Sequence, residues 1–534
     1  MGVGTWGDEP YGASTALRYH LGDRPLVDSW DTNFSSAVML SPLVGLWLEL
    51  TGSTDGLLLG LRSGYAIMAL LMAACSYRLL RLRALGLVGS LFSAGMILYL
   101  PFLSPFLGYG ADWQLHILSA LSAALLHDRI LERPHLALLP GVLSGLAIVG
   151  NPPTALVLPA FAGAFALADR SGAPDTPQRS AWWYLAGAML VGVGFLLALR
   201  MMAGPGMLSL IEHVAQPDDH AFDIASQIQR AWEGRWLVAM SAGLGVMIGA
   251  MSRRLSALGP LSLLASSMGL STLGVVFLAA THRLPIVTLP QSLAFVAGAA
   301  SLIALLLAGR LPSDRRLAFL TLPCLGAGAG WFLGSNAGVY SAVVTAPLLL
   351  LAAILWADDT ADTATDHSND KTSRVSLAFA VTLSALLLVW MGTGLYYTPE
   401  GRTPAMRATV TSGPFAGIKG TEEEVLFQQR VVAALRALPP AQGRVAYLER
   451  FSLGYLITPE RPGTYSTWAT AAGSNRLQQY VDATENRPLR VVLTRYAIDM
   501  RDGEFPETVN LRGFPELFRE IYRDDDLVVY DAAP

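Results

Sequence analysis

Charged residues are scarce in this sequence of 534 residues, and that scarcity excludes one broad class of function. Asp, Glu, Lys and Arg make up 15% of the chain, Lys371 and Lys419 are its only lysines, and the formal net charge is −4. The concentrated positive surface that nucleic-acid binding requires is therefore missing, and nucleic acid is not an expected partner. Cysteine is equally rare, and because Cys75 and Cys324 both stand within apolar runs, no disulfide framework is implied.

Several motifs that carry chemistry are also missing. The sequence has no CxxC or HExxH spacing, no P-loop, no dinucleotide fingerprint and no Ser/His/Asp order typical of hydrolases. These absences argue against a Cys/His metal site and against a cytoplasmic enzyme that uses nucleotides.

Long apolar runs are what the sequence has in abundance. Hydrophobic residues make up 52% of the chain and its mean hydropathy is +0.43, which is typical of a membrane protein. About twelve runs are long enough to cross roughly 30 Å of hydrocarbon. Two of them meet at Asn151-Pro152-Pro153 and are expected to be broken or re-entrant helices. The predicted spans are 57–80, 84–103, 113–126, 136–150, 152–168, 181–203, 236–251, 255–280, 294–309, 317–334, 339–357 and 375–397.

The positions of the basic residues predict the orientation of these spans. One set of alternate loops carries fourteen Arg or Lys residues and the opposite set carries three. Because positive loops are retained in the cytoplasm, the N-terminal stretch and everything after Tyr397 are expected outside a bacterial cytoplasmic membrane. An N-terminus on that side calls for a preceding helix, so we expect a thirteenth span upstream of Met1. Residues 36–52 are predicted to form a helix along the membrane surface, because Pro42 and Glu49 interrupt their apolar run.

The composition changes after Tyr397, where charges and turn residues become frequent. Thr421 and Glu424 form a capping-box pattern that predicts a helix through about Leu438. Short strands are predicted at 445–448, 489–494 and 526–530, and helices at 475–486 and 515–522, which together indicate a small α/β domain. The expected division is therefore an outer loop with an interfacial helix (1–56), a helical bundle (57–397) and an outer α/β domain (398–534).

Acidic residues on the predicted outer side are the candidates for chemistry. Asp8 and Glu9 precede the first span, and Asp112 stands at the start of the third. A pair of carboxylates can take a proton from a sugar hydroxyl, and Asp8 with Asp112 can hold a divalent cation such as Mg or Mn. The alternatives stay open: Asp8 and Glu9 are equally typical of a solvated tail, and Asp112 of an acid that stabilises a helix N-terminus.

Basic and polar residues near these acids are the candidates for binding. The His282-Arg283 pair in a short outer loop suits a phosphate group, although it can equally anchor the chain at the interface. Arg62 lies inside the first span, where it is costly unless it contacts a lipid phosphate or pairs with an acid such as Asp55. The remaining candidates for substrate contact are Tyr11, Arg18 and His20 of the first loop.

The order of residues in the first loop resembles that of a known class. The run GDEPYGASTALRYHLGDRPLVDSWDTNFSSAVMLSPL contains an Asp-Glu pair, an aromatic, a Gly-Asp turn and a Pro-Leu entering the next apolar segment. It resembles the first outer loop of the GT-C membrane glycosyltransferases, which include protein O-mannosyltransferases and the lipid A aminoarabinose transferase. The run RPHLALLPGVLSGLAIVGNPPTALVLPAFAGAFAL and the tail from GPFAGIKGTEEE through RVAYLERFSLGYLITPERPGTYSTW are also similar to members of that class, with Asn151 where a lysine is expected before the prolines.

The resemblance implies a GT-C-like bundle and transfer of a sugar from a polyprenyl-phosphate donor to a glycan, lipid or protein acceptor on the outer face. It implies that Asp8 is the catalytic or metal-holding carboxylate, with Glu9 beside it and Asp112 as the second acid. Two rivals stay open. A secondary transporter shares the many spans and broken helices, and a ligase or polymerase of surface polysaccharide shares the donor.

Overall fold

A computed structural model gives the structure of the protein and describes most of the chain. The described residues are 9–31, 33–83, 85–99, 112–168, 176–204, 224–254, 259–281, 289–334, 339–362, 406–469, 476–484, 486–494, 511–512, 514 and 516–533. The predicted span 375–397 lies outside them.

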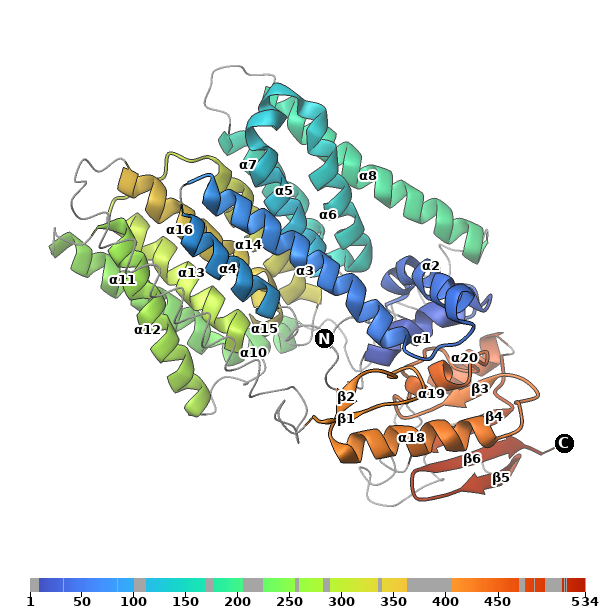
Figure 1. Cartoon of the computed structure of the whole chain (residues 1–534). Helices are drawn as coiled ribbons and strands as arrows, with labels where there is room; N and C mark the ends of the chain where they lie inside the picture. The colour runs from blue at the N-terminus through green and yellow to red at the C-terminus, as the bar shows by residue number, and fades with distance from the viewer. Residues whose placement is uncertain are drawn as a thin grey trace.

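The described part is mostly helical, as the apolar runs predict (Figure 1). Six helices are long and apolar enough to cross a membrane by length and composition, and they are α2, α3, α8, α11, α12 and α14. Several apolar helices of this length are typical of a membrane protein. The helices of this part are α1 Glu9–His20, α2 Phe34–Thr51, α3 Leu57–Arg81, α4 Gly86–Tyr99, α5 Asp112–Glu132, α6 Leu138–Gly150, α7 Val157–Ala168, α8 Thr176–Ala203, α10 Ile224–Glu233, α11 Arg235–Arg254, α12 Pro260–Ala280, α13 Leu289–Leu307, α14 Arg316–Gly334, α15 Val339–Ala342 and α16 Pro347–Asp362.

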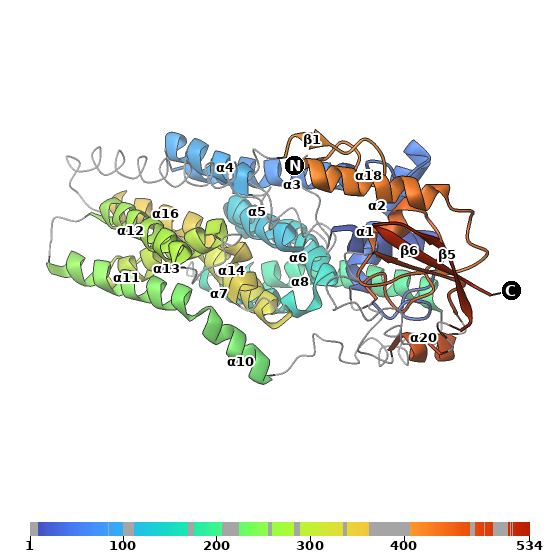
Figure 2. The same ribbon diagram turned by 90° about the horizontal axis from the view of Figure 1, so that it is seen from below.

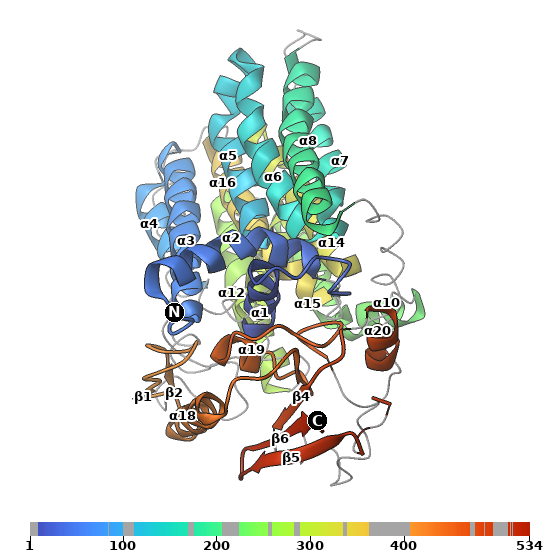
Figure 3. The same ribbon diagram turned by 90° about the vertical axis from the view of Figure 1, so that its right-hand side faces the viewer.

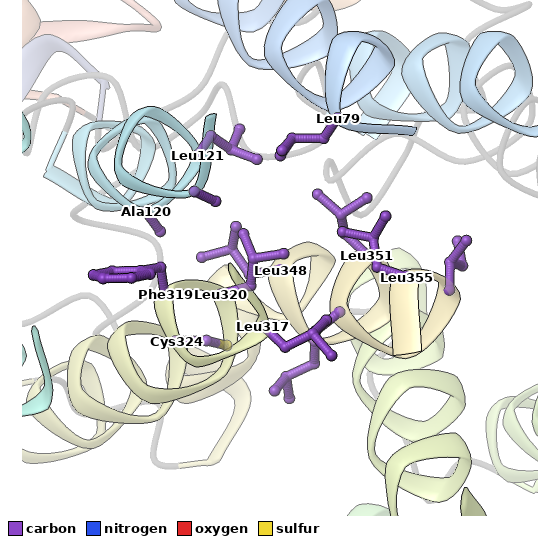
Figure 4. Close-up of a cluster of buried hydrophobic side chains, with 14 of the residues drawn as sticks. Leu79, Ala120, Leu121, Leu317, Phe319, Leu320, Cys324, Leu348, Leu351 and Leu355 are labelled. Atoms are coloured by element: carbon purple, nitrogen blue, oxygen red, sulfur yellow. The ribbon is translucent and has the colours of Figure 1, made fainter. Parts of the chain in front are cut away.

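The long helices pack side by side around one large apolar core. Leu121 of α5, Leu320 of α14 and Leu351 of α16 all belong to it, and Figure 4 shows these side chains in the space between the three helices. Most of the α8 surface is not covered in this way, because Trp182, Leu190 and many of its other apolar side chains are exposed. An exposed apolar face on a long helix is the arrangement expected where the helix contacts lipid.

Helix α2 differs in direction from the long helices. Figure 3 shows it lying crosswise at the end of the bundle nearest the C-terminal region. It continues through Pro42, and Leu43, Leu46 and Leu50 are exposed along it. A crosswise helix with an exposed apolar edge suits the predicted position at the membrane surface.

The prolines after Asn151 break the chain as predicted. Helix α6 ends at Gly150, a 3-10 turn covers Pro152–Leu156, and α7 begins at Val157. Gly141 and Gly145 lie one turn apart on α6 and allow it to approach α8 closely. A Cβ at Gly141 would lie only 2.1 Å from the carbonyl oxygen of Tyr184 on α8. This is small-residue helix packing.

The C-terminal region is a small mixed α/β unit. Its helices are α18 Glu422–Ala437, α19 Leu453–Ile457 and α20 Arg476–Thr484, and the predicted capping box at Thr421 is present at the start of α18. One sheet has the order β3-β4-β6-β5, in which β3 and β4 are parallel and the other pairs antiparallel. Its strands are β3 Val445–Tyr447, β4 Arg490–Thr494, β5 Phe518–Arg523 and β6 Leu527–Ala532, and a separate antiparallel pair comprises β1 Ala408–Thr409 and β2 Lys419–Gly420.

One element of this region differs from the prediction. Residues 515–522 were expected to be helical, but Phe518–Arg523 form strand β5. The side chain of Asp524 accepts hydrogen bonds of 2.7 Å from the backbone N–H groups of Asp526 and Leu527. This turn reverses the chain and places β5 against β6, so the hairpin prevails over local helix propensity.

The C-terminal region packs directly on the N-terminal helices. Leu17 of α1 and Leu58 of α3 belong to the same apolar cluster as Leu453, Tyr455 and Val529 of the C-terminal region. Figure 2 shows these segments together at one end of the molecule. The first loop and the last domain, far apart in the sequence, therefore form one structure over that end of the bundle.

Candidate functional site

The candidate site lies where α1 meets the beginnings of α3 and α5. Arg62 comes in the second turn of α3, and its guanidinium binds both carboxylate oxygens of Glu9 at the start of α1, with Nε to Oε1 at 2.8 Å and Nη2 to Oε2 at 2.6 Å. Both side chains are buried. A two-pronged contact of this kind is the geometry in which a buried charge is best compensated. Burial raises the pKa of Glu9, and the charge of Arg62 opposes that rise.

This pair bears on one expectation. Arg62 was expected to contact a lipid phosphate or to pair with an acid such as Asp55, and it does pair with an acid, which is Glu9 and not Asp55. Its contact with a donor phosphate stays a prediction. The carboxylate of Asp55 instead binds Arg436 of α18 and accepts a 3.1 Å hydrogen bond from the backbone N–H of Gly413. Asp55 therefore joins α18 to the loop before α3 and takes no part in the candidate site.

Tyr65 is a further buried polar side chain of the site. It lies one turn after Arg62, is buried, and its hydroxyl is within electrostatic reach of both Asp112 and Glu9. Asp112 begins α5 and is 1% exposed. A Cβ placed on Gly150 would lie 3.2 Å from the Cβ of Asp112, so glycine at the end of α6 allows this close approach. Glu9, Arg62, Tyr65 and Asp112 are thus brought together from α1, α3 and α5.

The carboxylate of Asp112 is unusual for its burial. The side chain of Asn151 and the backbone of Trp113 are polar neighbours of this carboxylate, yet neither of its oxygens has a hydrogen-bond partner of good geometry among the described residues. Buried polar atoms are almost always hydrogen-bonded, and exceptions often mark functional sites. Asp112 is therefore the described acid that is best placed to act on a bound ligand.

Two further polar side chains follow Asp112 on α5. Gln114 and His116 are buried, and no polar atom of either side chain has a partner in the part of the chain that the structure describes. The sequence analysis did not select them, although polar residues at the start of an apolar span are a recognised signal. They add two buried polar side chains to the first turns of α5.

Tyr11 belongs to a second polar network, which joins α1 to the C-terminal region. Its hydroxyl donates to Asp31 at 2.5 Å, and Ser466 donates to the other oxygen of Asp31 at 2.7 Å. Thr15 of α1 and Thr467 share a hydrogen bond of 2.7 Å. Asp31 is therefore a connecting acid that sequence reasoning missed, because its partner Ser466 lies 435 positions away.

The side chain of Arg18 on α1 makes several hydrogen bonds, both to the first loop and to the C-terminal region. It donates to Asp23 at 2.8 Å, to the carbonyl oxygen of Thr464 at 2.8 Å and to the hydroxyl of Tyr480 at 3.0 Å, and it also contacts the carbonyl oxygen of Asp28. Burial acts to lower the pKa of Arg18, but Tyr480 and Asp23 raise it well above its usual value, so the charge is permanent. These contacts hold the first loop against the C-terminal region.

His20 is exposed at the end of α1, and its ring packs beside Gly45 of α2. It lies at the surface, away from the buried Glu9 and Arg62 side chains. The substrate-binding roles expected for Tyr11, Arg18 and His20 stay predictions. The first two side chains already have partners within the protein.

An aromatic surface beside Tyr11 was also missed. The ring of Trp468 lies 5.2 Å from that of Tyr11, and the guanidinium of Arg450 lies 5.8 Å from the Trp468 ring. Arg450 and Glu449 both have positive φ angles, 63° and 57°, which are uncommon for residues other than glycine. Strained backbone next to a partly exposed tryptophan is typical of a binding loop.

Three predicted site residues, Asp8, His282 and Arg283, lie outside the described residues. In the described ranges no group of three His, Cys, Asp or Glu side chains is arranged to hold a metal ion. The described part of the site contributes one uncommitted carboxylate, Asp112, because Glu9 is paired with Arg62. That set alone does not fit a divalent cation.

Comparison with protein-family models, with curated proteins and with solved structures finds no match for this chain. The site is therefore defined by its geometry alone. Four side chains from three helices meet at the end of the bundle that α2 and the C-terminal region cover.

Proposed function

We propose that this chain is a GT-C-type membrane glycosyltransferase. It moves a sugar from a polyprenyl-phosphate donor to an acceptor at the outer face of the cytoplasmic membrane. The observation that carries the proposal is the buried Glu9–Arg62 ion pair together with the carboxylate of Asp112 at the start of α5, which is buried and has no hydrogen-bond partner among the described residues. A lipid-linked donor needs its reacting group at the boundary between membrane and water, and these residues lie at the ends of apolar helices beside the crosswise helix α2.

The distribution of arginines supports an outer position for this site. Arg83 binds Asp314 and Asp359, and Arg316 binds Asp128, so the loops that carry the predicted cytoplasmic arginines meet at one end of the bundle. The candidate site lies at the other end (Figure 1). The predicted bias of positive charge therefore agrees with a site outside the cytoplasm.

The proposed reaction uses two kinds of group, a carboxylate that acts as the base and a fixed positive charge. In the proposed reaction, the acceptor hydroxyl attacks the anomeric carbon of the donor sugar and loses its proton to a carboxylate. The bond from that carbon to the phosphate oxygen breaks, and polyprenyl phosphate leaves with the electron pair. Asp112 is the described candidate for the base, and Asp8, next to Glu9, is the predicted one. Arg62, held in place by Glu9, supplies positive charge where the phosphate departs.

The test uses the purified full chain with radiolabelled polyprenyl-phosphate sugars and a panel of glycan, lipid and peptide acceptors. We expect transfer by the wild type and losses of at least about 100-fold in Asp8→Asn and Asp112→Asn. Asp482→Asn is a matched control, because Asp482 is a half-exposed acid on α20. Full turnover in Asp112→Asn would remove Asp112 from the mechanism, and absence of transfer with every donor would reject the proposal.

One observation favours a second candidate function. The unpartnered polar atoms of Gln114 and His116 lie inside the bundle, where a secondary transporter holds its substrate. Reconstitution in liposomes separates the two functions. Uptake of a free solute that is lost in His116→Ala, without any sugar transfer, would support the transporter.

A further inference from the structure

A cleft of about 440 Å³ opens at the end of the bundle remote from the candidate site. It lies between the end of α3, the last turns of α5 and the segment that leads into α14. Its lining residues are Leu82, Arg83, His127, Asp128, Ser313, Asp314, Arg315 and Arg316. Three arginines and one histidine thus face two aspartates, and this cleft takes no part in the proposed transfer reaction.

Asp359, near the end of α16, binds the segment before α14 that forms one wall of the cleft. It accepts hydrogen bonds from the backbone N–H groups of Ser313 at 2.6 Å and Asp314 at 3.1 Å, and from the Ser313 hydroxyl at 2.9 Å. Arg83 lies 3.2 Å from the same carboxylate and 2.5 Å from that of Asp314. The segment before α14 is therefore held in one conformation, which is a condition for selective binding.

The arginines of the cleft keep hydrogen-bonding capacity. Both contacts of Arg83 with carboxylates run through Nη2, and Arg316 contacts Asp128 through Nη2 at 2.5 Å. A guanidinium has five N–H donors in a fixed plane. The acids therefore orient these two guanidiniums without using all their donors.

His127 provides the observation that points to a ligand. Its Nδ1 lies 2.8 Å from Asp128, and its ring packs edge-on against Phe319 at 5.8 Å. The imidazole is more than nine-tenths buried and lines the cleft, yet Nε2 has no partner among the described residues. When Nδ1 donates a hydrogen bond to Asp128, Nε2 is left to bind a ligand atom: it accepts from a hydroxyl of a protonated phosphate or, in the imidazolium form, donates to a phosphate oxygen.

We propose that this cleft binds a phosphate group. A phosphate presents several oxygens in different directions, which matches polar groups supplied to one cleft by Arg83, Arg316 and His127 from three separate segments. The group can belong to the headgroup of an anionic lipid, because the cleft lies at the ends of membrane helices, or to a soluble phosphate compound. Both sources share the same chemistry.

The test uses the full chain, purified in detergent in a buffer free of phosphate and sulfate. One arm titrates inorganic pyrophosphate by calorimetry, and the other measures binding of labelled phosphatidylglycerol against phosphatidylcholine in mixed micelles. Arg316→Gln is expected to raise the dissociation constant about tenfold or more. His127→Asn is expected to act in the same direction, because the asparagine amide keeps the contact with Asp128 but lacks Nε2.

Arg81→Gln is the matched control, since Arg81 is an exposed arginine of α3 outside the cleft. It should bind like the wild type. Binding of pyrophosphate identifies a soluble ligand, and selective binding of phosphatidylglycerol alone identifies a headgroup. The proposal is overturned if the wild type binds neither probe, or if Arg81→Gln weakens binding as much as Arg316→Gln does.

Discussion

Glu9 and Arg62 stand 53 positions apart in the sequence, yet their side chains form a buried ion pair that ties α1 to α3. Arg62 is fully buried at 0% exposure. A helix that lies along the surface of the bundle is thereby attached to one that enters it.

Breaking this pair should destabilise the protein strongly. In Arg62→Leu the Glu9 carboxylate remains buried without its partner, so we expect a loss of about 3–5 kcal/mol in unfolding free energy. Replacing both residues, as in Glu9→Gln with Arg62→Met, should recover most of that loss. Melting temperatures in detergent provide the measurement.

The surface pair Arg24 and Asp28 is the internal control. Their contact is 2.9 Å long, but the Arg24 side chain is 56% exposed. Arg24→Gln should therefore cost no more than about 1 kcal/mol. Equal effects of Arg24→Gln and Arg62→Leu would show that burial does not decide the strength of these pairs.

A second prediction concerns the attachment of the C-terminal region. Arg18 reaches Thr464 and Tyr480 from α1 and is buried among them. Arg18→Gln removes the charge and most of these donors, so the C-terminal region should be released from α1 and become more sensitive to protease. Limited proteolysis, followed by mass spectrometry, detects new cleavage between residues 406 and 469.

Arg461→Gln serves as the control for Arg18→Gln, because Arg461 is an exposed arginine of the same region. If Arg18→Gln is digested no faster than Arg461→Gln, the buried Arg18 contacts do not hold the two parts together.

A third prediction depends on the proposed function. The ring of Trp468 contacts both Tyr11 and Arg450 and is partly exposed. A sugar or acceptor can stack on its exposed part. Trp468→Ala should raise KM for the acceptor several-fold and leave kcat nearly unchanged, because stacking contributes to binding in both the ground and transition states. Trp468→Phe should restore most of the affinity. A fall in kcat at unchanged KM would reject this role.

Much of the helical part could be predicted because apolar runs and breakers act locally. The break at Asn151, the start of α3 at Leu57 and the capping box at Thr421 all follow from neighbouring residues. Helix ends shifted where polar residues continue the helix beyond its apolar run, as in α5, which was predicted from 113 to 126 and extends from Asp112 to Glu132.

The partners of the site residues could not be predicted in the same way. Glu9 was identified as a candidate and Arg62 as a costly intramembrane charge, but no pattern in the sequence joins them. No sequence pattern distinguishes Asp31, Ser466 and Thr467, because their contacts form only when the first loop and α1 pack against the C-terminal region. Tertiary contact alone decides which polar residues are buried together.

The last prediction concerns acid stability at the other end of the bundle. Burial opposes ionisation of Asp359, but hydrogen bonds from Ser313 and Asp314 and the charge of Arg83 lower its pKa below the usual 3.8. A carboxyl whose folded pKa is lowered contributes stability above its unfolded pKa, and that contribution disappears as the pH falls through the folded value. The melting temperature of Asp359→Asn should therefore lie below that of the wild type by a constant amount between about pH 7 and pH 5, and the gap should narrow below about pH 4.

Asp482→Asn should follow the wild type throughout, because its carboxylate is half exposed and lies 3.7 Å from its nearest arginine. A gap between Asp359→Asn and the wild type that stays constant down to pH 3 would show that the ionised form of Asp359 does not hold the segment before α14.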